Sequence, residues 1–487
     1  MTAKSLMFQG TGSDVGKSLM VAGLARAFVR RGLKVLPFKP QNMSNNAAVT
    51  KDGGEIGRAQ ALQARAANVV PTVDMNPVLL KPQSDVGAQV VVHGKVRGNA
   101  KAREYQKLKP ELLPDVMASF NRLKEEADLI LIEGAGSASE VNLRDGDIAN
   151  MGFAIEANVP VVLVADIDRG GVIGSLVGTC HVVAKEERDL IAGYIINKFR
   201  GDQSLFSGGI SIVKEQTGLE CFGIVPYLPI AAQLPAEDSM ALEQDSLKNK
   251  NGTVKIAVPK LSHISNFDDF DPLIAEPSVQ FEFVSPGQAL PGDAALIILP
   301  GSKATIADLT DFKVQGWDLD LETHARRGGH ILGICGGYQM LGTHIYDPEG
   351  IEGVSNDVPG LGYLGIQTIL ISDKTLLEVT GEVFSSLGKI RGYEMHSGQT
   401  MGAAILEPFA QLDGGPDGAV SEDGKIMGCY IHGLFAEDAF RSSFLNRLKS
   451  GAGSGLNYDA QVESALDALA DGLEKALDLD ALIEAAR

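Results

Sequence analysis

The chain has 487 residues, 44% of them hydrophobic and 22% charged, and it carries a formal net charge of −19. Its length leaves room for two or three domains whose cores need neither disulfides nor structural metals. The composition excludes a disordered or fibrous chain. The acidic charge argues against nucleic acid as a partner, because phosphate binding requires clustered Lys and Arg.

The cysteines and the N-terminus indicate the cellular compartment. Cys180, Cys221, Cys335 and Cys429 are far apart and form no CxxC pair. This spacing disfavours a zinc site or a disulfide framework and favours a reducing environment. Met1 leads directly into an apolar strand, and the sequence has no run of about 18 apolar residues. We therefore expect a cytoplasmic protein that does not span a membrane.

Short apolar runs alternate with helical stretches in the first half of the chain, which is typical of a parallel sheet covered by helices. Residues 15–31 predict a helix, because Met20, Leu24 and Phe28 recur on one face at the helical period. We assign residues 1–235 to a doubly wound α/β domain. Its predicted strands are Ser5–Gln9, Lys34–Phe38, Asp128–Ile132, Pro160–Ala165, Ile191–Ile196 and Cys221–Val225.

The composition becomes polar and acidic at residues 236–252, which we interpret as a linker. A second alternation of apolar runs and helices predicts another doubly wound α/β domain at residues 253–448. The tail, residues 449–487, is rich in Ala, Leu, Asp and Glu, and we expect it to be helical and to pack on the second domain. The predicted strands of the second domain are Val254–Val258, Val279–Val284, Ala295–Leu299, His330–Ile334 and Met427–Ile431.

A glycine-rich segment, GTGSDVGKS, runs from Gly10 to Ser18 between the first predicted strand and the first helix. This is the context of a phosphate loop, in which Gly10 and Gly16 let backbone N–H groups surround an anion. Lys17 would contact the phosphates of ATP, and the Ser18 hydroxyl would bind Mg²⁺. The spacing, G-x5-GKS, is similar to that of dethiobiotin synthetase and makes residues 1–235 P-loop NTPase-like. The alternative is a glycine-rich turn that merely begins a helix.

Polar side chains at the ends of other predicted strands extend this site. Glu133 ends a buried strand and would hold Mg²⁺ directly or through water, since hard cations prefer oxygen ligands. Asp166 and Asp168 are similar candidates at the carboxyl edge of the sheet. Asn197, after the next strand, would offer amide hydrogen bonds to the nucleotide base.

A second motif, G-x-C-x-G, joins a predicted strand to a helix and centres on Cys335. This is the pattern of a nucleophile elbow, and the helix N-terminus behind the cysteine would favour its thiolate. Gly301, at the end of another strand, and Gly336 would supply N–H groups to an oxyanion hole. The alternative is a buried, inert cysteine in a glycine-rich turn.

A cysteine nucleophile needs a base, and several histidines are candidates. We assign this role to His432, which ends a later apolar strand. His396 lies in a polar, Gly-rich stretch and is a second candidate for the same pocket. His330 begins the strand before the elbow, which favours a structural role.

Other segments carry a family resemblance together with these two motifs. These segments and the two motifs, in their order along the chain, resemble the cobyric acid synthases. In that family a class I glutamine amidotransferase with a flavodoxin-like fold is fused to an ATP-binding synthetase domain. The resemblance extends from Gly10 to about Leu448. The segments are residues 40–46 (PQNMSNN), 76–83 (NPVLLKPQ), 147–152 (DIANMG), 165–171 (ADIDRGG), 196–201 (INKFRG) and 265–272 (SNFDDFDP).

The resemblance implies a reaction and its residues. ATP with Mg²⁺ would activate the b, d, e and g carboxylates of adenosylcobyrinic acid a,c-diamide, and ammonia from L-glutamine would convert them to amides. Cys335 would form the γ-glutamyl thioester with His432 as its acid–base partner. Glu133 and Asp147 would lie near the phosphate and the substrate carboxylate.

One departure and two alternatives remain open. Class I amidotransferases usually carry Glu two residues after the catalytic His, but this position is Leu434. The cobyric acid subfamily resembles this chain in lacking that Glu, so His432 would be oriented by Glu394, by a backbone carbonyl, or by no charged group. The chain could instead be a cobyrinic acid a,c-diamide synthase, or a P-loop switch ATPase acting on a partner protein. The sequence predicts no oligomeric state.

Overall fold

The computed structural model describes residues 3–84, 87–235, 251–353, 356–384 and 387–487. The chain divides into two compact units. Unit 1 comprises Met1–Ser44, Thr50–Glu237 and Gln461–Arg487, whereas unit 2 comprises Asn45–Val49 and Asp238–Ala460. Most of the predicted linker, residues 236–250, lies outside the described residues.

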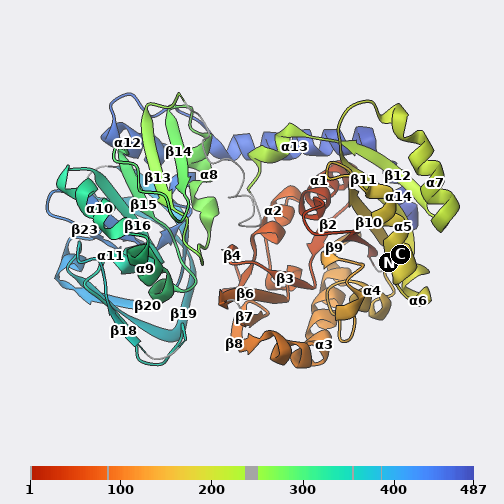
Figure 1. Ribbon diagram of the computed structural model, residues 1–487, viewed down its shortest axis with the longest axis horizontal. Coiled ribbons are helices and arrows are strands. Elements are labelled where there is room, and N and C mark those ends of the chain that lie inside the picture. The colour runs from red at the N-terminus through yellow and green to blue at the C-terminus, as the bar shows by residue number, and fades with distance from the viewer. Residues whose placement is uncertain (1–2, 85–86, 236–250, 354–355, 385–386) are drawn as a thin grey trace. The chain divides into compact units, whose positions relative to one another are not determined.

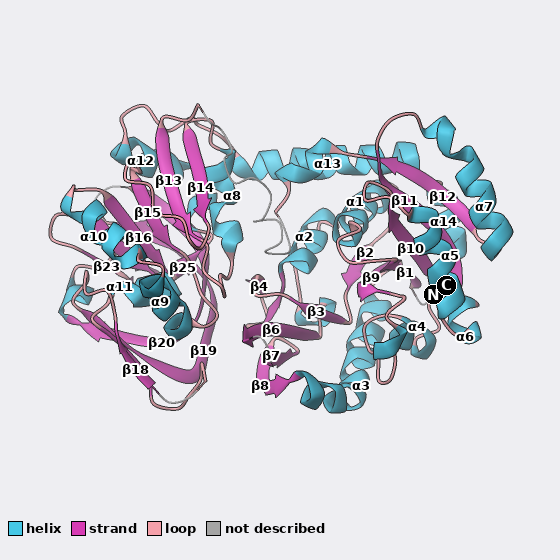
Figure 2. Ribbon diagram, in the orientation of Figure 1, coloured by secondary structure: helices cyan, strands magenta, loops and turns pink. Residues whose placement is uncertain are grey.

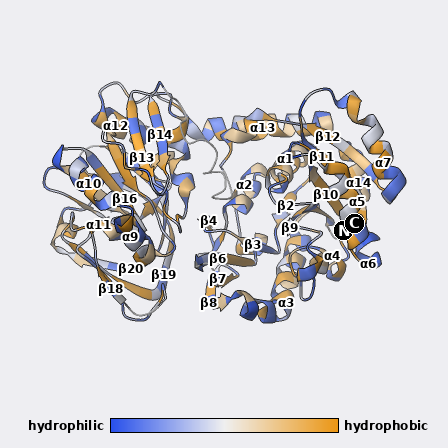
Figure 3. Cartoon of the chain, in the orientation of Figure 1, coloured by the Kyte–Doolittle hydropathy of each residue, from blue (hydrophilic) through white to orange (hydrophobic). Residues whose placement is uncertain are grey.

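The core of unit 1 is a parallel sheet with the strand order β12-β11-β10-β1-β9-β2 (Figure 1). Its strands are apolar along most of their length, as Figure 3 shows, because helices cover both faces. The strands predicted for the first domain all lie in this sheet, which confirms the doubly wound architecture. The bounds are β1 (Lys4–Gly10), β2 (Val35–Phe38), β9 (Leu129–Ser137), β10 (Val161–Asp166), β11 (Ile191–Phe199) and β12 (Glu220–Pro226).

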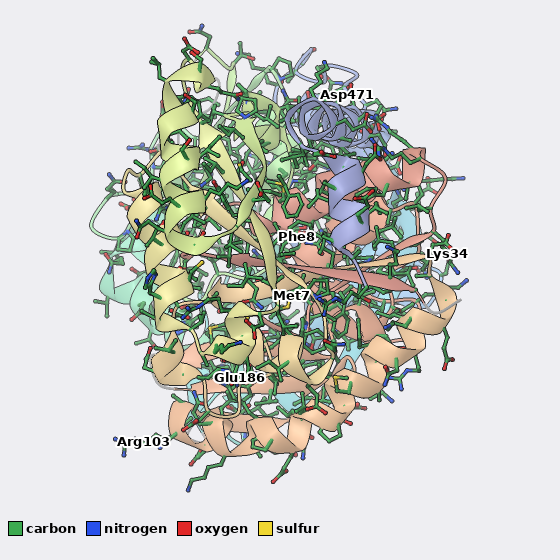
Figure 4. All side chains as sticks on the ribbon, turned by 90° about the vertical axis from the view of Figure 1, so that its right-hand side faces the viewer. Met7, Phe8, Lys34, Arg103, Glu186 and Asp471 are labelled. Carbon is green, nitrogen blue, oxygen red and sulfur yellow. The ribbon has the colours of Figure 1, made fainter. Side chains whose placement is uncertain are left out.

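Helices of unit 1 lie on both sides of this sheet (Figure 2). In Figure 4, Met7 and Phe8 of β1 lie between the helix that carries Asp471 and the helix that begins near Arg103. The helices are α1 (Lys17–Arg30), α2 (Arg58–Ala66), α3 (Ala102–Glu126), α4 (Met151–Glu156), α5 (Val172–Val182), α6 (Lys185–Arg188), α7 (Ser207–Thr217), α13 (Tyr458–Ala476, of which residues 461–476 belong to unit 1) and α14 (Leu479–Ala485).

A smaller sheet of unit 1, with the order β3-β6-β7-β8, was not predicted from the sequence. Its strands are short or exposed: β3 has three residues, and β8 is exposed at most positions. They therefore lack the clear alternation that marks a half-buried strand. The bounds are β3 (Gln41–Met43), β6 (Val78–Ser84), β7 (Gly87–Val92) and β8 (Lys95–Lys101); the short strand β5 (Glu55–Gly57) of unit 1 is not part of this sheet.

The C-terminal tail is helical as predicted, but residues 461–487 pack on unit 1, so the expected packing on the second domain is wrong. Leu469 and Leu473 of α13 meet α1 at Gly23, where a Cβ atom would lie 2.5 Å from Leu473 Cδ1. Arg26 of α1 also forms a salt bridge with a carboxylate of α13 at 2.6 Å. The tail packs here because its apolar face fits the small-residue face of α1.

Leu473→Ala should destabilise unit 1 by about 2–4 kcal/mol, because it removes a buried side chain and leaves a cavity against α1. Leu473 is 1% exposed. Hydrogen exchange followed by mass spectrometry would measure the loss of amide protection in α1. As a control, Leu205→Ala at an 84% exposed position of unit 1 should change protection little. Equal protection in both variants would contradict the assigned packing.

The core of unit 2 is a sheet with the order β14-β13-β15-β16-β24-β23, parallel except at the edge strand β23. This confirms a second doubly wound domain. No helix in the described ranges of the chain is long and apolar enough to cross a bilayer. The bounds are β13 (Val254–Pro259), β14 (Val279–Val284), β15 (Leu296–Leu299), β16 (His330–Ile334), β23 (Ala419–Val420), β24 (Ile426–Cys429), α8 (Asp271–Ala275), α9 (Thr305–Val314), α10 (Trp317–Arg326), α11 (Gly336–Leu341) and α12 (Asp438–Leu448).

Unit 2 holds a further sheet, with the order β18-β17-β19-β20-β25, that the sequence did not predict. The predicted strand Met427–Ile431 is divided at Tyr430, so that β24 belongs to the parallel sheet and β25 to this one. Tyr430 N–H donates to Asp417 Oδ2 at 3.0 Å where the chain changes sheets. The bounds are β17 (His344–Asp347), β18 (Asn356–Pro359), β19 (Ile366–Val383), β20 (Gly388–Gly402), β21 (Ala410–Leu412), β22 (Gly415–Asp417) and β25 (Ile431–His432); the short strand β4 (Ala47–Val49) of unit 2 is not part of this sheet.

Candidate functional site

Cys335 lies in a strained turn between β16 and α11 of unit 2. Its φ is 50° and its ψ is −107°, a conformation that residues with a side chain rarely adopt outside functional sites. The turn is packed closely, because a Cβ atom on Gly337 would lie 2.0 Å from the Leu299 carbonyl oxygen. Cys335 N–H donates to the carbonyl oxygen of Cys429 on β24 at 2.8 Å. The turn therefore has the geometry of a nucleophile elbow.

His432 reaches the elbow from β25, which pairs with β20. Its Nδ1 lies 2.7 Å from Asp269 Oδ2, and Asp269 Oδ1 accepts a hydrogen bond from Gly433 N–H at 2.6 Å. The side chains of His432 and Asp269 are each 1% exposed, and the Tyr393 ring stacks on His432. Since a carboxylate binds Nδ1, that nitrogen carries the proton and Nε2 is directed to Cys335.

The charge of His432 follows from its neighbours. Burial lowers the pKa of an imidazole, but the Asp269 carboxylate and a hydrogen bond with Cys335 outweigh burial and raise the pKa of His432 to about 10. His432 is therefore an imidazolium at neutral pH. Its ring can therefore donate a proton to a leaving group at Cys335.

Because position 434 is Leu, the sequence left open which group orients His432. Asp269 has this position in the structure, and it was not predicted. Asp269, and not Glu394, is the carboxylate bound to His432 Nδ1. A signal was present, because Asp269 follows β13 in the loop SNFDDFDP, at the carboxyl edge of a parallel sheet. The loop is anchored by the buried Phe270.

The other histidine candidates have different surroundings. The His396 ring stacks on Tyr430 with centroids 3.7 Å apart, and its Nδ1 lies 3.1 Å from the carbonyl oxygen of Gly398. Burial lowers the pKa of His396 to about 4, so this ring is neutral at physiological pH. His330 begins β16, at the opposite end of the strand from the elbow. His432 is thus the candidate that the structure brings to Cys335.

The predicted oxyanion glycines lie beside the elbow. A Cβ atom on Gly301 would lie 3.0 Å from His432 Cε1, and one on Gly336 would lie 2.9 Å from Ser302 N. Gly336 is also the first residue of α11, where helix N–H groups point toward the turn. Both glycines are placed where N–H groups could stabilise an oxyanion, and that role stays a prediction.

The phosphate loop lies in unit 1, from Gly10 at the end of β1 to the start of α1. Gly16 has a φ of 92°, and a Cβ atom there would lie 2.5 Å from Asn197 Nδ2. Asn197 donates to a loop carbonyl at 2.9 Å, and Lys17 Nζ donates to the Gly136 carbonyl at 2.9 Å. Loop, lysine and asparagine therefore meet at the carboxyl edge of the sheet, where open α/β sheets bind ligands.

Glu133 and Ser18 form the predicted pair of oxygen donors. Ser18 Oγ donates to Glu133 Oε1 at 2.8 Å, and Lys39 Nζ lies 2.8 Å from the same oxygen. Gln63 Nε2 donates to Glu133 Oε2 at 2.6 Å. Mg²⁺ sites beside substrate phosphates commonly use one or two protein oxygens, so this pair fits the ion. Lys39 balances the charge of the buried carboxylate.

Asp166 and Asp168, the other acids predicted at this edge, are both paired with cations. Asp166 Oδ2 lies 2.9 Å from Lys198 Nζ, and Asp168 Oδ1 lies 2.8 Å from Arg200 Nε. The Arg200 guanidinium also stacks over the Tyr227 ring at 3.5 Å. These ion pairs link the residues at the ends of β10 and β11, and a role of the two aspartates in binding a ligand stays a prediction.

A pocket lies beside the phosphate loop in unit 1. Its lining includes Gly16, Asn197, Tyr227, Leu228 and Leu473. Apolar walls with one amide side chain are suited to a flat purine base. Asn197 lines this pocket, and its contact with the base stays a prediction.

Asp147 lies in the turn that leads into α4. Its Oδ1 accepts hydrogen bonds from the N–H groups of Ala149 at 2.8 Å and Asn150 at 3.1 Å, and its Oδ2 accepts one from Gly152 N–H at 2.9 Å. The carboxylate therefore organises this turn. Its catalytic role stays a prediction.

Comparison with known proteins gives a matching family model for each of the two predicted domains. The chain matches the model of the CobQ/CobB/MinD/ParA nucleotide binding domain over residues 6–241 and that of the CobB/CobQ-like glutamine amidotransferase domain over residues 255–440. The cobyric acid synthase of Bradyrhizobium diazoefficiens is 58% identical over 485 residues and 100% of both chains. That of Sinorhizobium fredii is 58% identical over 475 residues and 98% of both chains. The chain belongs to the cobyric acid synthase family.

Proposed function

We propose that this chain uses ATP and ammonia from L-glutamine to convert peripheral carboxylates of a corrinoid to amides in cobalamin biosynthesis. The observation that carries the proposal is the buried Cys335–His432–Asp269 arrangement in the same chain as a phosphate loop. The name of its relatives, cobyric acid synthase, supplies the corrinoid. We assign the b, d, e and g carboxylates of adenosylcobyrinic acid a,c-diamide as the acceptors.

The glutamine step follows from the geometry of unit 2. The Cys335 thiolate attacks the side-chain amide carbon of glutamine, and N–H groups of Gly301 and Gly336 stabilise the oxyanion. His432 then gives its Nε2 proton to the departing nitrogen, and ammonia leaves a γ-glutamyl thioester. Water, deprotonated by His432, hydrolyses the thioester to glutamate and restores the thiolate. Asp269 keeps the imidazole oriented throughout.

The ATP step is assigned to unit 1, because a carboxylate resists attack by ammonia. Transfer of the γ-phosphoryl group to the carboxylate forms an acyl phosphate, and ammonia displaces phosphate to give the amide. Lys17 and the backbone of the phosphate loop hold the phosphates, while Ser18 and Glu133 would hold Mg²⁺, which neutralises phosphate charge. Asp147 would lie near the substrate carboxylate. ATP and glutamine are cytoplasmic metabolites, so we propose the cytoplasm as the compartment.

Product masses test this function. Purified protein with adenosylcobyrinic acid a,c-diamide, ATP, Mg²⁺ and glutamine should give a product with four carboxylates converted to amides. Conversion only of the a and c carboxylates of cobyrinic acid would identify the diamide synthase instead. ATP hydrolysis that is independent of a corrinoid, without amide formation, would favour a switch ATPase.

Lys17→Ala should slow amidation about 10²-fold or more with either glutamine or ammonium, because its charge stabilises the transferred phosphoryl group. Glutaminase activity measured without ATP should persist, since Lys17 lies in unit 1. Steady-state amidation rates with each nitrogen source would measure the effect. Lys185→Ala, at a lysine on the exposed helix α6, is the control and should leave both rates unchanged. An unchanged rate in Lys17→Ala would contradict the nucleotide site.

A further inference from the structure

The turn at residues 266–269 contacts both nitrogens of the His432 imidazole. Asp269 binds Nδ1, and the Asn266 amide nitrogen lies 3.4 Å from Nε2. Asn266 is 2% exposed and has a left-handed φ of 52°, which asparagine tolerates better than most residues. Asp269 N–H donates to the Asn266 carbonyl at 3.1 Å, so the two contacts share one rigid turn. A shift of this turn would displace the base at both nitrogens.

The segment of residues 45–49, which contains β4, holds the turn through two hydrogen bonds. Ala47 N–H donates to Asn266 Oδ1 at 3.0 Å, and Phe267 N–H donates to Asn46 Oδ1 at 3.4 Å. A backbone N–H can only donate, so the first bond fixes the orientation of the Asn266 amide. Its oxygen faces Ala47, and its NH₂ group faces His432 Nε2, to which it can donate once Nε2 has given up its proton.

The segment 45–49 is far from the turn in the sequence. Residues 45–49 belong to unit 2, whereas the chain on both sides of them builds unit 1. Asn46 is 2% exposed, so its hydrogen bond with Phe267 N–H is shielded from water. Removing the Asn46 oxygen would leave a buried N–H unpaired, which destabilises the turn that carries Asp269.

We propose that Asn46 is a positioning residue of the glutaminase centre and acts through the 266–269 turn to hold the His432 imidazole in place beside Cys335. This inference rests on the proposed function, because it assigns Asn46 to the glutamine-hydrolysing step. Asn46 acts through Asn266 and Asp269 and not on the substrate.

Kinetics of full-length variants test the inference. Asn46→Ala should lower kcat of glutamine hydrolysis about 5- to 50-fold, with KM within about twofold, because a buried hydrogen-bond partner is lost. Asn46→Asp keeps an accepting oxygen at the same place and should recover most of kcat. Asn45→Ala is the matched control, since the Asn45 side-chain oxygen is buried but accepts no hydrogen bond from the described residues.

Two further readouts separate positioning from a general loss of structure. Asp269, Cys335 and His396 are titratable groups that face His432. In Asn46→Ala, kcat of glutamine hydrolysis should begin to fall at a lower pH than in the wild type, because the turn no longer holds the Asp269 carboxylate that raises the pKa of His432. Amidation driven by ammonium should stay at the wild-type rate. A general loss of structure would lower the ammonium-driven rate as well.

The outcomes distinguish this inference from the proposed function. Wild-type kcat with an unshifted pH profile of kcat in Asn46→Ala would overturn the positioning role, as would an equal loss in Asn45→Ala. An equal loss of ammonium-driven amidation would also overturn it. If the wild-type protein left glutamine intact, the proposed function would fail as well.

Discussion

Cys335→Ala should abolish amidation with glutamine, by about 10³-fold or more, and leave amidation with ammonium intact. The thiolate of Cys335 forms the covalent intermediate, and an alanine offers no substitute nucleophile. The ATP-dependent step needs ammonia but not its source, so added ammonium bypasses the lost step. Amide formation measured by mass spectrometry, with glutamine and with ammonium, gives both rates.

Cys221→Ala is the control for this variant, because Cys221 lies on β12 of unit 1. It should retain both rates. Loss of ammonium-driven amidation in Cys335→Ala would mean that the substitution disturbs more than the glutaminase step. Retention of glutamine use would remove Cys335 from the nucleophile role.

Asp269→Asn should lower kcat of glutamine hydrolysis about 10²- to 10⁴-fold, since the group that fixes the imidazole tautomer and charge is lost. Without the carboxylate, burial dominates and lowers the pKa of His432 from about 10. The wild-type imidazolium persists at neutral pH, whereas the variant ring becomes neutral as pH rises through a lower value. The residual kcat of glutamine hydrolysis should therefore fall at a lower pH in the variant than in the wild type, because the proton donor is lost earlier.

Glu394→Gln is the matched control, because Glu394 was the carboxylate among the three alternatives that the sequence left open for orienting His432. It lies on β20, and burial raises its pKa, which makes a neutral replacement conservative. We expect glutamine hydrolysis within a few-fold of wild type. A large loss in Glu394→Gln, with little loss in Asp269→Asn, would reverse the assignment of the orienting group.

The sequence predicted the parts of the fold that produce strong local patterns. Buried parallel strands read as continuous apolar runs, so both central sheets were found. The sheets β3-β6-β7-β8 and β18-β17-β19-β20-β25 were missed, because partly exposed strands mix apolar and polar residues. The tail was placed on the wrong unit, since its amphipathic pattern shows that a face is buried but not which partner buries it.

The residues of the candidate site also fall into those that the sequence predicted and those that it did not. Motifs with tight local spacing identified Lys17, Ser18 and Cys335, because a loop or an elbow is formed by consecutive residues. Asp269 and Asn46 were not assigned, because their partners are far away in the sequence. Asp269 contacts His432, and Asn46 contacts the turn that carries Asp269. Such partners have no fixed spacing from the residue they support.

The path of the chain between the units has a practical consequence for dissecting the protein. It passes from one unit to the other at Ser44–Asn45, Val49–Thr50, Glu237–Asp238 and Ala460–Gln461. A cut within residues 236–252 would therefore yield a C-terminal fragment without Asn46 and an N-terminal fragment without the helix that packs on α1. Each half would thus lack a segment that belongs to its own compact unit, so fragments divided at the linker do not correspond to the two units.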